Sequence, residues 1–134
     1  MSEHDEQKAL MDWTKQMEGR VPELKYLFAI PNGTRTNLRI AHYMKQEGVR
    51  KGVPDLCLPL PRNGHGALYI EMKTIKPSGR KSYPEPEQRE WLAGLEAVGN
   101  RAAVCWSWIE AAKTILEYLG YDPRLIGALV GEEY

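Results

Sequence analysis

The chain has few cysteines and no long apolar segment. Its 134 residues include two cysteines, Cys57 and Cys105, in unrelated contexts, which excludes a disulfide framework and a cysteine-based zinc site. No window approaches about 18 consecutive apolar residues, so a transmembrane helix is excluded. The N-terminus is acidic and polar, so a signal peptide is not expected. We expect one domain, residues 1–134, in a reducing cytoplasmic compartment.

The formal net charge is zero, because 18 basic residues balance 18 acidic ones. A zero sum argues weakly against a nucleic-acid binder. The segment 35–81, however, holds ten basic and three acidic residues, which leaves it at +7 and the flanks together at −7. A basic segment of this kind attracts polyanions. The alternative is a solvated surface on which the charges cluster by chance.

Apolar periodicity predicts a mixed α/β fold. Four helices are expected, at 2–19, 36–47, 86–98 and 107–120, with a short helix or turn after Asp122. Four strands are expected, at 25–30, 55–60, 67–75 and 101–106. The second and third strands are separated by a glycine-rich turn, which favours an antiparallel hairpin. This order predicts a small mixed central sheet flanked by helices.

Two predicted helices carry a polar residue on their apolar face. In the first, the face formed by Leu10 and Trp13 extends backwards to Glu6 and then Glu3. A carboxylate buried without a partner is costly, whereas an acid in the first turn simply suits the helix dipole. Both interpretations stay open. In helix 86–98, Gln88 lies on the stripe shared by Trp91, Leu92, Leu95 and Val98.

The strands offer one group of residues suited to catalysis. Glu71 and Lys73 are two apart in a strand and share a face. Across the hairpin, Asp55 falls opposite or diagonal to them. Two adjacent carboxylates resist ionisation unless a cation lies between them, and oxygen ligands suit Mg²⁺ or Mn²⁺. Such an ion can activate water on a phosphodiester, and Lys73 can orient the water. The alternative is a cross-strand ion pair.

The same residues resemble a known nuclease superfamily. Pro54-Asp55, a gap of fifteen residues and Glu71-Met72-Lys73 match the PD-(D/E)xK pattern. The surrounding sequence, from about Glu6 to Leu119, resembles the VRR-NUC (virus-type replication-repair nuclease) family. The matching segments include Ala29–Gly33 with Arg35, Gly52–Leu56, Leu68–Lys73, Glu87–Gln88 with Trp91–Leu92, and Val104–Cys105. The chain is most similar to the short, stand-alone type found in phages and prophages.

The resemblance implies a restriction-endonuclease-like core and a set of roles. Asp55 and Glu71 would be metal ligands, with the Met72 carbonyl a possible third. Lys73 would be the catalytic lysine. The first helix would contribute an acid that also serves the metal, which we assign to Glu6, although Glu3 competes for the position. Gln88 would be the glutamine that the following helix lends to the site.

The resemblance also implies a metal-dependent DNA endonuclease with Mg²⁺ or Mn²⁺ as cofactor. The expected substrate is branched DNA such as a Holliday junction, cut by a homodimer in a bacterial or phage-infected cell. Two alternatives are a monomeric flap or end-processing nuclease and a non-catalytic DNA-binding module. The candidate DNA contacts are Asn32, Arg35, Lys45, Lys51, Lys76 and Arg80. Asn32 and Arg35 are equally compatible with a structural turn.

Overall fold

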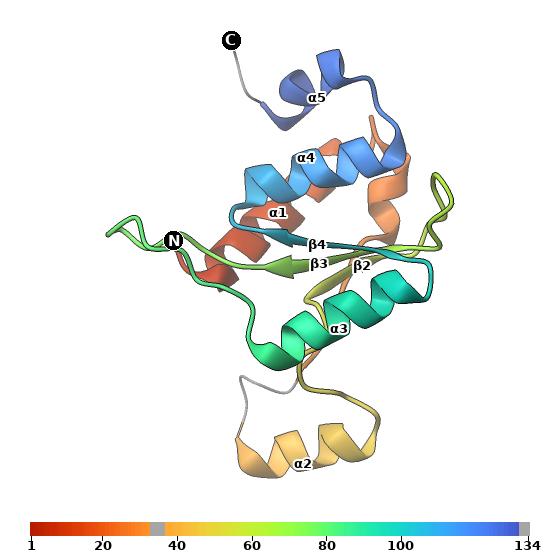
Figure 1. Cartoon of the computed structure of the whole chain (residues 1–134). Helices are drawn as coiled ribbons and strands as arrows, with labels where there is room; N and C mark the ends of the chain where they lie inside the picture. The colour runs from red at the N-terminus through yellow and green to blue at the C-terminus, as the bar shows by residue number, and fades with distance from the viewer. Residues whose placement is uncertain (33–36, 132–134) are drawn as a thin grey trace.

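The computed structural model describes residues 1–32 and 37–131. Its elements, in chain order, are α1 (Glu3–Met17), the 3₁₀ helix η1 (Pro22–Tyr26), β1 (Phe28–Ala29), α2 (Leu38–Gln46), β2 (Leu56–Leu58), β3 (Leu68–Met72), α3 (Pro86–Ala97), β4 (Arg101–Cys105), α4 (Trp108–Leu119) and α5 (Pro123–Val130). Figure 1 shows helices on both sides of a central sheet. The predicted mixed α/β class is confirmed.

The sheet is mixed and its strands follow chain order, β1-β2-β3-β4. The β1–β2 and β2–β3 pairs are antiparallel, so the predicted hairpin is confirmed. The β3–β4 pair is parallel, and α3 forms the crossover that a parallel pair needs. Within the described residues no helix is long and apolar enough to cross a membrane.

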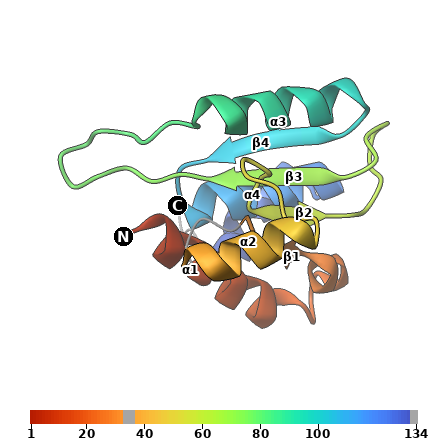
Figure 2. The ribbon, with the colours of Figure 1, turned by 90° about the horizontal axis from the view of Figure 1, so that it is seen from below.

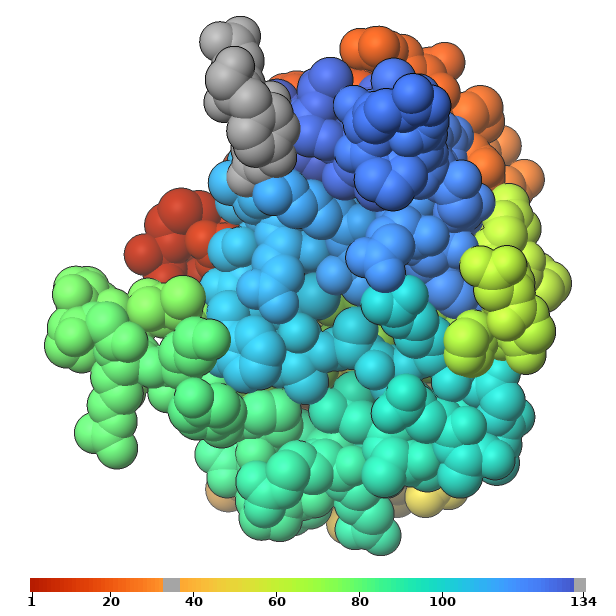
Figure 3. All heavy atoms as spheres, turned by 45° about the horizontal axis from the view of Figure 1, so that its top comes forward, coloured from red at the N-terminus to blue at the C-terminus, as the bar shows by residue number. Residues whose placement is uncertain are grey.

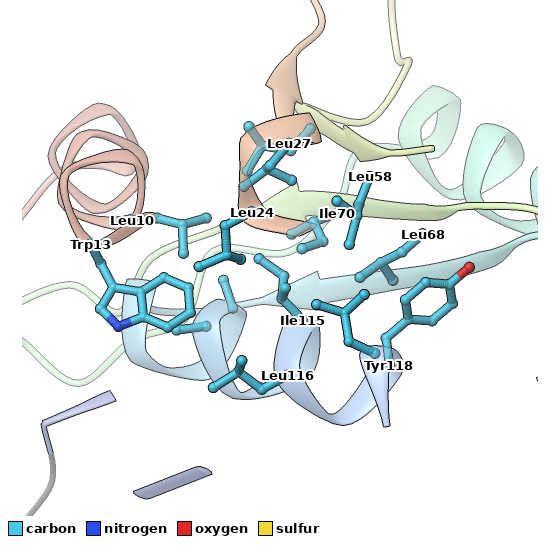
Figure 4. Close-up of a cluster of buried hydrophobic side chains, with 14 of the residues drawn as sticks. Leu10, Trp13, Leu24, Leu27, Leu58, Leu68, Ile70, Ile115, Leu116 and Tyr118 are labelled. Carbon is cyan, nitrogen blue, oxygen red and sulfur yellow. The ribbon is translucent and has the colours of Figure 1, made fainter. Parts of the chain in front are cut away.

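The hydrophobic core lies between the sheet and the helices α1, α4 and α5. Figure 4 shows Leu10 and Trp13 of α1 meeting Ile115 and Leu116 of α4 beneath Ile70 of β3. All five are at most 5% exposed. The Trp13 indole N–H also donates to the Leu129 carbonyl at 3.0 Å, which ties α1 to α5. This packing fixes α1 against the end of β3 where the candidate site lies.

The strand expected at 25–30 is wrong over most of its length. A 3₁₀ helix occupies Pro22–Tyr26, and β1 covers only Phe28–Ala29. The physical reason is the position of the buried side chains. Leu24 and Leu27 are both buried and lie three residues apart, which matches the 3₁₀ period and not the alternation of a strand.

The helices α2 and α3 depart from the expected burial. No side chain of α2 is buried, and Figure 1 shows this helix at the lower end of the view, beyond α3. The apolar face predicted for α3 is only partly covered: Trp91, Leu92 and Leu95 are half-buried, and Val98 is 77% exposed. The helix α3 contacts mainly β4, on the opposite side of the sheet from α1 and α4.

Candidate active site

The β2–β3 hairpin brings Asp55 and Glu71 side by side. Leu56 pairs with Ile70, so the register places Asp55, which immediately precedes β2, opposite Glu71. One carboxylate oxygen of Asp55, Oδ2, accepts the Met72 N–H at 2.7 Å. This bond fixes the Asp55 side chain on the β3 backbone and resolves the register that the sequence left open.

Glu71 is buried in an unusual electrostatic environment. Its side chain is 1% exposed, and its Oε1 atom has no hydrogen-bond partner. Burial and the adjacent Asp55 carboxyl raise the pKa of Glu71 from its ordinary value of 4.5 to about 8, while the charge of Lys73 opposes the rise. The protein alone therefore compensates the negative charge of this carboxyl pair poorly.

Lys73 supplies the positive charge on this face. Its side chain is buried, with Nζ 3.6 Å from Glu71 Oε2 and 3.7 Å from Glu3 Oε1. The ammonium thus connects the end of β3 with the first turn of α1. The structure brings Asp55, Glu71 and Lys73 together as the strand alternation indicated.

The structure places Glu3, and not Glu6, beside these residues. Glu6 is buried, but its Oε2 atom accepts the Trp108 N–H at 2.7 Å, at the first turn of α4. Glu6 therefore satisfies an N–H group that a helix start leaves unpaired. The two glutamates are three residues apart on one helix face, and α1 packs so that Glu3 reaches the strand while Glu6 reaches α4.

Gln88 turns toward the carboxyl pair as expected. Its Oε1 atom accepts the Glu85 N–H at 2.8 Å as part of a capping box at the start of α3. With its oxygen held in this way, the amide Nε2 donates to Glu71 Oε2 at 3.2 Å. The cap therefore orients Gln88, and Gln88 in turn orients Glu71.

Glu3, Asp55, Glu71 and Gln88 open onto a cleft of about 680 Å³, here called the carboxylate cleft. The residues that line it include Glu3, Gln7, Asn32, Met44, Lys51, Asp55, Glu71, Glu85, Glu87 and Gln88. Five of these side chains are carboxylates and one is a lysine. Gln7 was missed in the sequence, although its place one helical turn after Glu3 could have indicated it.

The donor set fits a hard divalent cation. Among residues 1–32 and 37–131, no three His, Cys, Asp or Glu side chains converge on a metal position. Asp55 and Glu71 alone would supply the protein carboxylates, and Mg²⁺ commonly binds through one or two carboxylates while keeping several waters. The unpartnered Oε1 atom of Glu71 fits such a ligand. A ligand role for the Met72 carbonyl stays a prediction.

The predicted DNA contacts lie in three places. Asn32 and Lys51 line the carboxylate cleft, and Lys45 is on α2. Lys76 and Arg80 are exposed on the segment between β3 and α3, which projects from the body (Figure 3). Arg35 lies outside the described residues. Lys45 and Lys51 nevertheless line one cleft together with Asn32, whereas Lys76 and Arg80 do not line it.

The fold and the carboxylate–lysine arrangement define a nuclease-type domain, and comparisons with known proteins agree. The model of the VRR-NUC domain family matches residues 1–108, so the chain belongs to this family. A solved structure described as a VRR_NUC domain protein is 28% identical, with a TM-score of 0.71 over 89% of this chain and 88% of the other. No curated protein matches the chain. Family membership indicates a nuclease-type function.

Proposed function

We propose that the protein is a metal-dependent DNA endonuclease that hydrolyses phosphodiester bonds. The observation that carries the proposal is the pair formed by half-buried Asp55 and buried Glu71, which has an unpartnered Glu71 oxygen and lies beside Lys73. Without a cation, the five carboxylates of this cleft repel a phosphate at the cleavage point itself. A bound cation would reverse this field and admit the phosphate.

Each residue has a distinct part in the proposed reaction. Asp55 and Glu71 would hold Mg²⁺ or Mn²⁺, which when bound polarises the phosphoryl oxygen and promotes ionisation of water. Lys73 donates a hydrogen bond to the attacking water or to the non-bridging phosphate oxygen, where negative charge develops. Glu3 holds the Lys73 ammonium in place, and Gln88 holds the Glu71 carboxylate.

For the substrate we propose branched DNA, such as a four-way junction, cut by a homodimer. Two active sites related by a dyad suit a junction with two-fold symmetry. The exposed face of α2 is the surface that favours self-association. Ile40 and Tyr43 lie three residues apart on this unburied helix and are 47% and 52% exposed. Mutating Ile40→Asp should then shift the protein to a monomer in sedimentation.

For the DNA backbone we propose contacts through the basic residues outside the carboxyl pair. Lys51 and Asn32 would serve the phosphates next to the cleavage point, because both line the carboxylate cleft. Lys76 and Arg80 would reach more distant phosphates from the projecting segment. Such contacts make affinity fall steeply with salt.

The test is cleavage of labelled four-way junction, flap and linear duplex DNA with Mg²⁺ or Mn²⁺. Paired symmetric cuts in the junction, lost in a folded Lys73→Ala variant, are the expected result. Cleavage of flaps or ends alone would keep the chemistry and refute the junction assignment. A folded protein that cuts none of these substrates would refute the enzyme and leave a DNA-binding module.

A further inference from the structure

A second cleft continues from the carboxylate cleft. It measures about 780 Å³ and lies between α2, the loop after it and α3; we call it the lateral cleft. Asn32 and Lys51 line both clefts, so a DNA strand can pass from one to the other. The other lining residues are Ala41, Lys45, Gly48, Val49, Arg50 and Trp91. Basic side chains together with an accessible indole are typical of a site that binds a nucleotide, because the cations contact phosphates and the ring stacks on a base.

We propose that the lateral cleft binds one unpaired nucleotide of the DNA strand next to the cleavage point. The base would stack on Trp91, and the adjoining phosphates would contact Lys45, Arg50 and Lys51. The inference rests on the proposed function for the position of the scissile phosphate. It adds a requirement that the carboxyl pair does not impose, namely an unstacked base beside the cut.

Trp91 is suited to stacking because it is available and correctly placed. It is half-buried and is not part of the hydrophobic core. It follows Gln88 by three residues on the same face of α3, about 4.5 Å along the helix axis at 1.5 Å per residue. Gln88 lines the carboxylate cleft and Trp91 lines the lateral cleft, which adjoin at Asn32 and Lys51. A strand whose phosphate lies near Glu71 can therefore place its next base at Trp91.

The three cations make the cleft selective for a polyanion. Lys45, Arg50 and Lys51 are all exposed. Lys51 also forms an ion pair with Glu87 at 3.6 Å, but both side chains are more than half exposed. Pairs of this kind contribute little, so Lys51 can exchange Glu87 for a phosphate. Of the other nearby acids, Glu90 lines a third cleft that shares Lys51 and Trp91 with this one, and Glu47 at the end of α2 is exposed and does not line the lateral cleft.

The test measures binding without cleavage. Fluorescence anisotropy in EDTA compares an eight-nucleotide thymidine oligomer with an oligomer of equal length built from abasic tetrahydrofuran nucleotides. The wild type should bind the thymidine oligomer at least about 5-fold more tightly, since stacking on one aromatic ring is worth this much or more. In Trp91→Leu this preference should disappear, whereas Trp91→Phe should retain part of it.

The phosphate contacts have a separate readout. Lys45→Gln should reduce the slope of log affinity against log salt by about 0.7, the value for one phosphate of a single strand. Trp91→Leu should leave that slope unchanged. Two controls match these variants: Val98→Ser, which removes an exposed apolar side chain at the C-cap of α3, and Lys15→Gln, which removes an exposed charge from α1. Both should bind as the wild type does.

Retention of the full preference for bases in a folded Trp91→Leu variant, or no preference in the wild type, would overturn the inference. Neither result depends on metal or cleavage, so these measurements can refute the nucleotide site without testing the proposed endonuclease activity. A protein with the expected base preference that cuts no DNA with Mg²⁺ would refute the endonuclease and keep the nucleotide site.

Discussion

Replacing Glu71 by glutamine should stabilise the metal-free protein at alkaline pH. The folded-state pKa of Glu71, about 8, lies above its ordinary value of 4.5. The folded protein therefore binds the proton more tightly than the unfolded chain does, and the free energy of unfolding falls as pH rises from 4.5 to about 8. The full loss is roughly 5 kcal/mol, because a tenfold change in acidity corresponds to about 1.4 kcal/mol. Glu71→Gln removes this loss and keeps an oxygen that can face the cleft.

Urea unfolding in EDTA across this pH interval measures the effect, with the difference between wild type and Glu71→Gln isolating the one carboxyl. The variant should be the more stable protein at the upper end, and the difference should vanish toward the lower end. Adding Mg²⁺ should raise the stability of the wild type and leave the variant unchanged, because the cation compensates the ionised carboxylate. A variant less stable than the wild type at every pH would refute the electrostatic account of the pair.

Two further predictions each compare a pair of substitutions that should have different effects. Glu3→Ala should slow DNA cleavage about 10–100-fold, as expected for a residue that positions a catalytic group, with little change in thermal stability; Glu6→Ala should instead cost about 1–3 kcal/mol in urea unfolding, because the N–H group it satisfies is left unpaired. Equal effects of both changes on cleavage would contradict the assignment. Gly52 has φ +93°, and a Cβ there would lie 3.0 Å from the Glu87 carbonyl oxygen, so Gly52→Ala should destabilise by about 1–3 kcal/mol. Gly94→Ala, within α3 and with nothing within 4 Å, should stabilise by about 0.5–1 kcal/mol; a stabilising Gly52→Ala would show that the loop can move away from α3.

The geometry around the carboxyl pair could be predicted because it depends on local periodicity. Alternation along β3 puts Glu71 and Lys73 on one face, and the turn between the strands limits where Asp55 can lie. Periodicity placed Gln88 on an apolar helical stripe, but its place in the site was implied only by the resemblance to the family. The exact pairing register of β2 and β3 could not be predicted from the sequence. In the structure, the hydrogen bond from the Met72 N–H to Asp55 establishes it.

The remaining differences come from tertiary packing. The spacing of Glu3 and Glu6 puts both on one face of α1, and only the docking of that helix against β3 and α4 decides which one reaches Lys73. The amphipathic pattern of α3 likewise predicts an apolar face but does not say what covers it. In the structure Trp91 is half-buried outside the hydrophobic core and lines the lateral cleft together with Ala41 and Lys45 of α2.

The most direct test of the account is metal-dependent cleavage of a labelled four-way junction by the wild type and by Asp55→Asn. Asparagine keeps a side-chain oxygen that can accept the Met72 N–H, so the hairpin register should be retained, while the negative charge that would hold the cation is lost. The account predicts cleavage by the wild type with Mg²⁺ or Mn²⁺, none in EDTA, and none by a folded Asp55→Asn variant. Wild-type cleavage in EDTA, or an Asp55→Asn variant that cuts at the wild-type rate, would contradict it.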